Sequence, residues 1–236
     1  MKRLKTLMML LVAALTTVTL YSCDIDDDNC PSFSLATVTL RPATEGRNWC
    51  MQLDDSTTLH AVNIASHPYN DKEQRAYIRF NDPKPIPESS QREYTVNVLT
   101  IDTILTKPMA PLLKSAEENV EEDINAKEYG SDPVEIVNSW ETVAEDGYMN
   151  IRFRTRFGGG KHRVTLVHRT DASEPYVVEF FHDANGDLDG VVNDGIVAFR
   201  LDEAFNAGDK AIEITLKWNS YSGEKTAKFK YLPRKD

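Results

Sequence analysis

The sequence predicts an all-β protein in which a small barrel is followed by an antiparallel β-sandwich. Three observations lead to this prediction. Short stretches rich in Thr, Val, Ile and Tyr show strand patterns, turn-forming clusters separate these stretches, and a proline-rich, acidic segment divides them into two groups.

The chain begins with the pattern of a bacterial lipoprotein signal peptide, residues 1–22. Three basic residues come first, an apolar stretch from Leu7 to Leu20 follows, and it ends in Leu20-Tyr21-Ser22-Cys23, which resembles a lipobox. The apolar stretch is too short to span a bilayer comfortably. We therefore expect Cys23 to be lipidated, with an ordinary cleavage site before a chance Cys as the alternative.

An acidic run follows in the segment 23–32, which contains Asp24, Asp26, Asp27 and Asp28. Acidic residues directly after a lipidated Cys resemble the lipoprotein export signal of Bacteroidota, and they also suit a solvated tether. We therefore expect a cell-envelope protein that is lipid-anchored in the outer membrane, with exposure at the cell surface as a further expectation.

The charge of the chain limits its partners. The whole chain has 27 Lys and Arg against 37 Asp and Glu, and loss of residues 1–22 removes three basic residues and changes the formal charge from −10 to −13. So acidic a chain argues against nucleic acid as a partner. No second apolar run is long enough to span a bilayer, and the remaining ~210 residues suffice for one large β domain or two small ones.

The three cysteines have different expected roles. With lipid on Cys23, Cys30 and Cys50 are left as a pair outside the cytosol, where disulfides persist. A bridge between them would close a loop of about 20 residues and stabilise the fold by roughly 3 kcal/mol in the chain-entropy model. The alternative is two free thiols.

Residues 33–108 are expected to form the barrel. Turn clusters at Arg41–Gly46, Asp54–Ser56 and Asn81–Pro87 separate short strands, whose spacing over about 75 residues fits a five-stranded OB-type barrel. The predicted strands are Ser34–Leu40, Thr58–Ile64, Arg75–Phe80 and Tyr94–Leu105.

Residues 109–133 are expected to be a linker. Pro108 and Pro111 oppose regular strand pairing, and an acidic stretch follows from Glu117 to Asp123. Leu112–Ala126 fits a short helix or an irregular excursion equally well.

Residues 134–236 are expected to form the sandwich, because seven strands at this spacing fit that fold. One helical turn is expected at Leu201–Phe205. The predicted strands are Val134–Thr142, Tyr148–Phe157, Lys161–Arg169, Tyr176–His182, Gly195–Leu201, Ala211–Trp218 and Thr226–Leu232.

Two of these strands are expected to form a hairpin across Gly158-Gly159-Gly160. A two-residue turn at Gly158-Gly159 sets Phe153 opposite Val164 and keeps one face apolar. The other face is then basic and needs negative charge above it, because like charges oppose each other across the strands. Either the protein's own carboxylates, such as Glu179, or an anionic ligand would supply that charge. The residues of this predicted basic patch are Arg152, Arg154, Arg156, Lys161 and Arg163.

The acidic stretch Phe180–Gly195 has the oxygen-rich composition of a calcium loop. Counted from Asp183, position 6 of an EF-hand loop is Leu188 instead of Gly; counted from Asn185, position 12 is Ile196, which cannot ligate. We therefore expect a long hairpin connection built from turn-forming residues, with a Ca²⁺ site of another type as the alternative. The candidate metal ligands are Asp183, Asn185, Asp187, Asp189 and Asp194.

No catalytic motif stands out, so we expect a protein that is not an enzyme and has no cofactor. The histidines lack the spacing of a helical zinc site, and His162 falls on the apolar face of the predicted hairpin, as a structural histidine would. There is no Gly-x-Ser-x-Gly motif, and Gly158–Lys161 lacks the Walker spacing. A carboxylate pair for glycoside hydrolysis stays open, but no particular pair is favoured.

Several local features occur together in one order. They are the lipobox, the strands that end in Ile101–Pro108, the segment Gly160–Val167, and Phe181–Asp187 followed by Asp194–Phe199. In this combination the chain resembles the NigD-like lipoproteins of Bacteroidota over nearly its whole length. The resemblance implies an N-terminal OB-type domain and a C-terminal β-sandwich, and it supplies no catalytic residues. The family is named for a member encoded beside a bacteriocin, which suggests a role in immunity.

The leading hypothesis is a non-enzymatic, lipid-anchored envelope protein that binds an unknown protein or glycan. Two alternatives stay open. One is bacteriocin immunity by capture of a toxin. The other is a glycan-handling enzyme or calcium-dependent sugar binder, because one face of an OB barrel can hold oligosaccharides.

Overall fold

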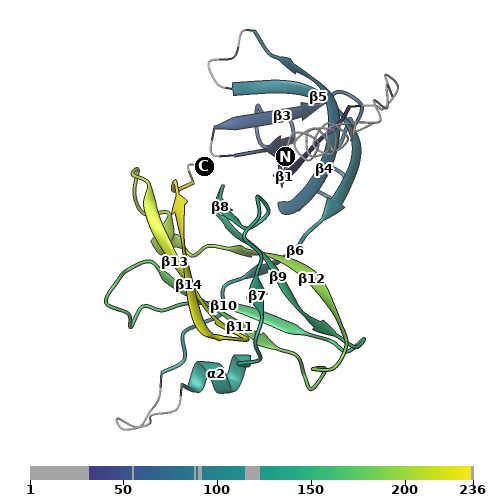
Figure 1. Cartoon of the computed structure of the whole chain (residues 1–236). Coiled ribbons are helices and arrows are strands. Elements are labelled where there is room, and N and C mark those ends of the chain that lie inside the picture. Colours follow the sequence, from purple (N-terminus) through teal and green to yellow (C-terminus); the bar gives the residue numbers. More distant parts are fainter. Residues whose placement is uncertain (1–31, 55, 88, 90–91, 115–122, 235–236) are drawn as a thin grey trace, which may run out of the picture. The chain divides into compact units, whose positions relative to one another are not determined.

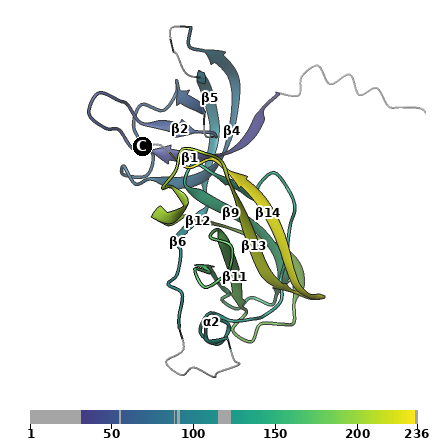
Figure 2. The same cartoon turned by 90° about the vertical axis from the view of Figure 1, so that its left-hand side faces the viewer.

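The computed structural model describes residues 32–234, apart from residues 55, 88, 90–91 and 115–122 (Figures 1 and 2). The predicted signal peptide of residues 1–22, the lipidated Cys23 and Cys30 lie outside the described residues. Within the described part, the predicted all-β class and the division into a barrel and a sandwich are confirmed.

Five strands close into the barrel in the order β1-β2-β3-β5-β4, and β4 pairs back onto β1. This arrangement fits the predicted OB-type barrel. Alternate residues of the first strand, Ala36, Val38 and Leu40, are buried inside it, where they pack with Met51 and Ile78. The strands are β1 (Ser34–Arg41), β2 (Cys50–Gln52), β3 (Thr57–Ala61), β4 (Gln74–Pro85) and β5 (Arg92–Thr103).

Two features of the barrel differ from the prediction. The strand β2 has only three residues, which is too few to show an alternating pattern. The expected turn at Asn81–Pro87 is partly strand, because β4 bulges near Asp82 and continues until Pro85 pairs opposite Tyr94. A bulge is one of the places where a strand tolerates proline.

Two sheets form the sandwich, one in the order β10-β11-β13-β14 and one in the order β6-β12-β9-β7, with β8 paired to β9. The rings of Phe153, Phe180 and Phe199 belong to the shared core, with centroid distances of 5.5 Å and 6.2 Å between successive pairs. The strands are β6 (Leu105–Pro108), β7 (Glu135–Ile136), β8 (Val143–Glu145), β9 (Tyr148–Phe157), β10 (Arg163–His168), β11 (Val177–Asp183), β12 (Val191–Arg200), β13 (Ile212–Ser220) and β14 (Gly223–Tyr231).

The boundary between the domains differs from the predicted one. The strand β6 pairs in parallel with β12, so Leu105–Pro108 belongs to a sheet of the sandwich and not to the barrel. The sandwich is therefore not purely antiparallel, and β11 and β13 also pair in parallel. Within the predicted linker, Ala110 bridges to Val167, and a short helix α2 (Ile124–Tyr129) is capped by the Asp123 side chain.

The predicted hairpin between β9 and β10 is wrong, because β9 pairs with β12 and β10 pairs with β11. Phe153 and Val164 do face the core, but from opposite sheets. The period of two in the side chains is the same in either arrangement, so the pattern alone does not distinguish them. Gly158 and Gly160 instead allow a close approach of Asp187, because a Cβ at either position would collide with the Asp187 side chain.

The stretch Phe180–Gly195 is likewise not a hairpin connection. It leaves β11 in one sheet and enters β12 in the other. Asn185 and Gly186 have φ values of 52° and 82°, so the expected turn formers do make a turn. The predicted helical turn is confirmed as the 3₁₀ helix η1 (Glu203–Phe205).

Candidate functional site

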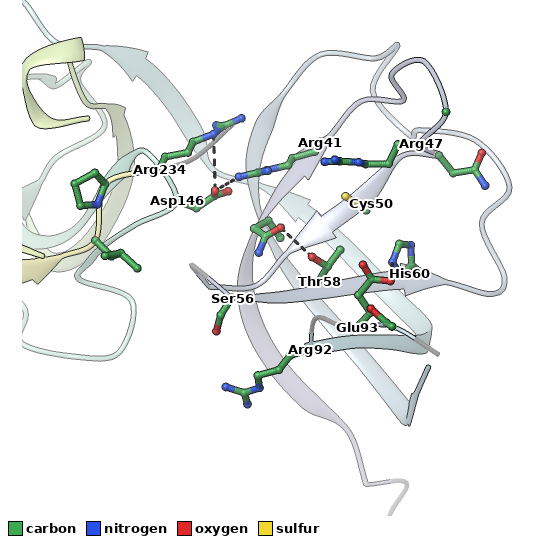
Figure 3. Close-up of a pocket in the computed structure, with 16 residues that line it drawn as sticks. Arg41, Arg47, Cys50, Ser56, Thr58, His60, Arg92, Glu93, Asp146 and Arg234 are labelled. Atoms are coloured by element: carbon green, nitrogen blue, oxygen red, sulfur yellow. Dashed lines mark hydrogen bonds and ion pairs between the residues drawn. The ribbon is translucent and has the colours of Figure 1, made fainter. Parts of the chain in front are cut away.

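A groove of about 910 Å³ lies on the barrel over β2 and β3 (Figure 3). Strands 2 and 3 and their neighbouring loops form the face with which OB barrels bind oligonucleotides and oligosaccharides. Barrel and sandwich belong to one compact unit that begins at Phe33, and the sandwich residues Asp146 and Arg234 also line the groove. The barrel side chains in Figure 3 include Arg41, Arg47, Cys50, Thr58, His60, Arg92 and Glu93.

The end of β1 and the loop that follows it bring Arg41 and Arg47 to this groove. Backbone hydrogen bonds of 3.0 Å join Thr44 and Arg47 in both directions, and Gly46 between them has a φ of 78°. This tight turn confirms the turn predicted at Arg41–Gly46 and places the exposed Arg47 beside the groove. Figure 3 shows its side chain pointing back toward Arg41.

The four arginines of the groove differ in their partners. Arg41 forms an ion pair with Asp146, and Arg234 donates two hydrogen bonds, of 2.7 Å and 2.8 Å, to Glu73. Within the described residues, no ion pair joins the exposed side chains of Arg47 or Arg92 to a carboxylate. The groove therefore offers two guanidinium groups without acidic partners in an otherwise acidic protein.

Two further nitrogen atoms of the groove are buried and unsatisfied. Nε of Arg41 and Nε2 of His60 have no hydrogen-bond partner in the described part of the chain, and the nearest carboxylate oxygen to Nε2, on Glu93, is 3.6 Å away. A buried polar atom without a partner is destabilising unless a ligand or water satisfies it. The hydroxyl of Thr58 donates to Oε1 of Gln52 at 3.0 Å, so it offers a ligand only its lone pairs.

Cys50 lies at the base of this site as a buried free thiol. Burial raises the pKa of the thiol, although the charges of Arg41 and Arg47 work in the opposite direction. A raised pKa disfavours the thiolate that a nucleophile would need. The predicted bridge from Cys50 to Cys30 stays a prediction, because Cys30 lies outside the described residues.

The five candidate metal ligands do not converge on one point. Asp187 accepts hydrogen bonds from the backbone amides of Gly158 and Gly160, at 2.9 Å and 2.7 Å, and Asp194 lies on β12 beside arginines. Asp183 pairs with Arg163, while Asn185 and Asp189 are exposed. No group of three potential metal ligands is present among the described residues. The acidic residues thus fix turns and pair with arginines.

The protein's own carboxylates pair with three of the five residues of the predicted basic patch. Arg152 and Arg154 both bind Asp194, at N–O distances of 2.9 Å and 2.6 Å for their Nε atoms. The hydrogen bond from Arg154 is the main cause that lowers the pKa of Asp194 to about 2. Glu179, the partner suggested above, pairs instead with Arg169. Of the remaining patch residues, Arg163 pairs with Asp183, Arg156 bonds the Gly190 carbonyl and Lys161 is exposed.

The structure brings together two histidines that the sequence spacing did not connect. Nδ1 of His162 lies 2.8 Å from Nε2 of His182, and the rings stack. Nε2 of His162 faces Asp187 at 3.3 Å, and Nδ1 of His182 faces the carbonyl of Asp132 at 3.2 Å. This relay of hydrogen bonds ends on a backbone carbonyl and not on a nucleophile, so it favours the structural role expected for His162.

Sequence reasoning did not find the groove. Its arginines are spread over some fifty residues of barrel sequence, and Asp146 and Arg234 come from the sandwich. The one available signal was the OB-type strand order, because that order identifies strands 2 and 3 as the usual binding face.

Two family models match this chain, one over each domain. A family model described as the NigD-like N-terminal OB domain matches residues 37–104, and one described as the NigD-like C-terminal beta sandwich domain matches residues 116–231. The chain belongs to the NigD-like family. No curated protein matches it.

Solved structures resemble this NigD-like protein over most of its length. A protein described as toxin-related from Parabacteroides distasonis is 28% identical, with a TM-score of 0.64 over 86% of this chain and 94% of that chain. A protein of unknown function from Bacteroides vulgatus is 20% identical, with a TM-score of 0.65 over 85% and 91%. A NigD-like immunity protein from Bacteroides caccae is 21% identical, with a TM-score of 0.53 over 86% and 99%. The last two likenesses concern the fold alone.

The described residues contain no helix with the length and apolar character needed to cross a membrane.

Proposed function

We propose that this NigD-like protein is a non-enzymatic, lipid-anchored protein of the cell envelope, held in the outer membrane by Cys23, that binds its ligand in the groove of the barrel. The groove carries the proposal, because it combines the usual binding face of an OB barrel with unpaired guanidinium groups and unsatisfied buried nitrogens. Its size lies within the range of ligand sites, roughly 300–1,000 Å³.

Membrane fractionation of cells that produce the full chain tests the anchor. Cys23→Ala removes the lipid acceptor, so the variant should leave the membrane fraction, because a diacylated Cys would be the attachment. Cys30→Ala is the matched control and should stay with the membrane. A Cys23→Ala variant that remains membrane-bound contradicts the anchor.

Photo-crosslinking in intact cells tests the binding face. A photoreactive amino acid at Asn48, which lines the groove and leaves its arginines in place, should yield an adduct with a bound partner, whereas the same amino acid at Arg156, which lies on the sandwich, should not. An adduct formed only from position 156 would move the binding face to the sandwich.

A second candidate function is bacteriocin immunity by capture of a toxin. It is favoured by one fold neighbour, the NigD-like immunity protein from Bacteroides caccae. Deletion of the gene should then sensitise cells to a bacteriocin from a neighbouring strain, and the chain with Cys23 should restore resistance. Unchanged sensitivity to such toxins counts against this role and leaves ligand binding in the groove untouched.

A further inference from the structure

We infer that the groove of the barrel binds an anionic oligosaccharide, with phosphate or carboxylate groups held by Arg47 and Arg92. This inference rests on the proposed function, since it names the ligand class of the same groove. The guanidinium groups of Arg47 and Arg92 are exposed and have no carboxylate partner within the described chain, whereas those of Arg41 and Arg234 pair with carboxylates. Guanidinium groups match carboxylate and phosphate oxygens in pairs.

The remaining polar groups of the groove suit sugar hydroxyls. Nε2 of His60 is buried without a hydrogen bond, 3.6 Å from a carboxylate oxygen of Glu93, and the side chains of Ser56 and Thr58 lie on the same face. Such a set of short donors and acceptors matches the hydroxyl groups of a sugar ring better than the apolar side chains of a peptide. Leu232 and Pro233 are the apolar side chains that contribute to the groove besides Cys50.

Nucleic acid is the other usual ligand of this OB face, and the lining argues against it. Single-stranded nucleic acid binds OB barrels through aromatic rings on which successive bases stack. Among the described residues that line the groove there is no Phe, Tyr or Trp. The nearby Trp49 is buried and packs edge-on against His67, so its ring does not offer an exposed platform.

Calorimetric titration of the unlipidated mature chain, residues 24–236, tests the inference. The probes are trigalacturonate for the carboxylate, a terminally phosphorylated maltotriose for the phosphate, neutral maltotriose and galactotriose, deca-thymidylate, and a decameric Glu peptide. We expect at least one anionic trisaccharide to bind about tenfold or more tightly than its neutral counterpart, and this preference should weaken as salt is raised. The two anionic probes distinguish carboxylate from phosphate recognition.

Matched double variants locate the site. Arg47→Ser with Arg92→Ser should weaken binding of the anionic trisaccharide at least tenfold, since both exposed guanidinium groups are lost. Lys84→Ser with Arg79→Ser removes the same charge from exposed positions elsewhere on the barrel and should change the affinity less than twofold. Equal melting temperatures of the two variants would show that both remain folded.

The other outcomes separate failure of this inference from failure of the proposed function. Neutral trisaccharides that bind as tightly as anionic ones, with binding lost in the Arg47 and Arg92 variant, would keep the groove and overturn the anionic class. A preference for deca-thymidylate or the Glu peptide would also overturn it. Anionic binding that survives the groove variant would place the site elsewhere and overturn the proposed function too. Absence of binding by both anionic trisaccharides at millimolar concentration overturns the inference.

Discussion

Arg75 is a charged side chain with no exposed surface. Its guanidinium group donates to Oγ1 of Thr39 at 3.0 Å and to Oδ1 of Asn150 at 3.3 Å, and it forms an ion pair with Glu145. Thr39 belongs to the barrel, whereas Asn150 and Glu145 belong to the sandwich. A buried charge is tolerated when its partners satisfy it, so this residue joins side chains of both domains.

Removal of this buried charge should destabilise the protein strongly. We expect Arg75→Ala to lower the free energy of unfolding by about 3–5 kcal/mol, because it leaves the pocket unfilled and Glu145 without this cation. Urea unfolding monitored by circular dichroism measures the change. Arg79→Ala, an exposed change on the same strand, should stay within about 1 kcal/mol of wild type. Equal losses in both variants would contradict the role of Arg75.

Glu73 should make stability depend on acid pH. Burial opposes its charged form, but hydrogen bonds from Arg234 and Tyr148 outweigh burial and lower its pKa from 4.5 to about 2. Because the pKa is lower in the folded state, the carboxylate stabilises the fold above pH 4.5, and this stabilisation is lost as the pH falls toward 2. The shift corresponds to about 3 kcal/mol.

Urea unfolding between pH 7 and pH 3 tests this dependence. Glu73→Gln should be less stable than wild type at pH 7, and the difference should shrink toward pH 3. Glu213→Gln breaks an exposed ion pair with Lys228 and serves as the control, with little change across the range. A Glu73→Gln difference that stays constant with pH would show that the carboxylate charge is not responsible.

At the scale of elements, a hydrogen bond joins His162, which directly precedes β10, to His182 on β11. Because Nδ1 of His182 faces a carbonyl, it carries the proton there, and its Nε2 accepts from Nδ1 of His162. A second proton on His182 would break this hydrogen bond. Burial, together with the nearby His162, lowers the pKa of His182.

This arrangement predicts a loss of stability just below neutral pH. The unfolded chain takes up a proton on His182 near pH 6.5 while the folded chain resists it, so stability should fall as the pH drops from 7 to 5. His182→Gln should reduce this fall, measured as the shift of the urea midpoint. His168→Gln removes another histidine of the same sheet and should leave the fall unchanged; if both variants behave alike, His182 is not its source.

The elements themselves were largely predictable, whereas some of their pairings were not. Alternation located β9 and β10 to within two residues, because each strand buries one face. It did not reveal that they lie in different sheets, since both arrangements bury the same side chains. The strand β6 was assigned to the barrel because it follows β5 directly, and its parallel partner β12 lies about ninety residues further along the chain.

At the scale of the whole molecule, the sequence predicted the two domains and the family but not the binding groove. A motif search detects residues that are close in sequence, and the groove draws Arg41, Arg47 and Arg92 from separate strands and loops of the barrel. The predicted basic patch failed for a different reason. Its arginines do follow one another along one strand without acidic residues between them, but Asp194 on the neighbouring strand neutralises two of them.

The central claim is that the barrel groove binds an anionic oligosaccharide, and chemical-shift mapping tests it most directly. Amide ¹H–¹⁵N spectra of the mature chain are recorded as trigalacturonate and the phosphorylated maltotriose are added. The largest changes should fall on Arg47, His60, Arg92 and their neighbours, and the neutral trisaccharides should leave these signals in place. Changes centred on the sandwich, or absent for both anionic probes, would contradict the claim.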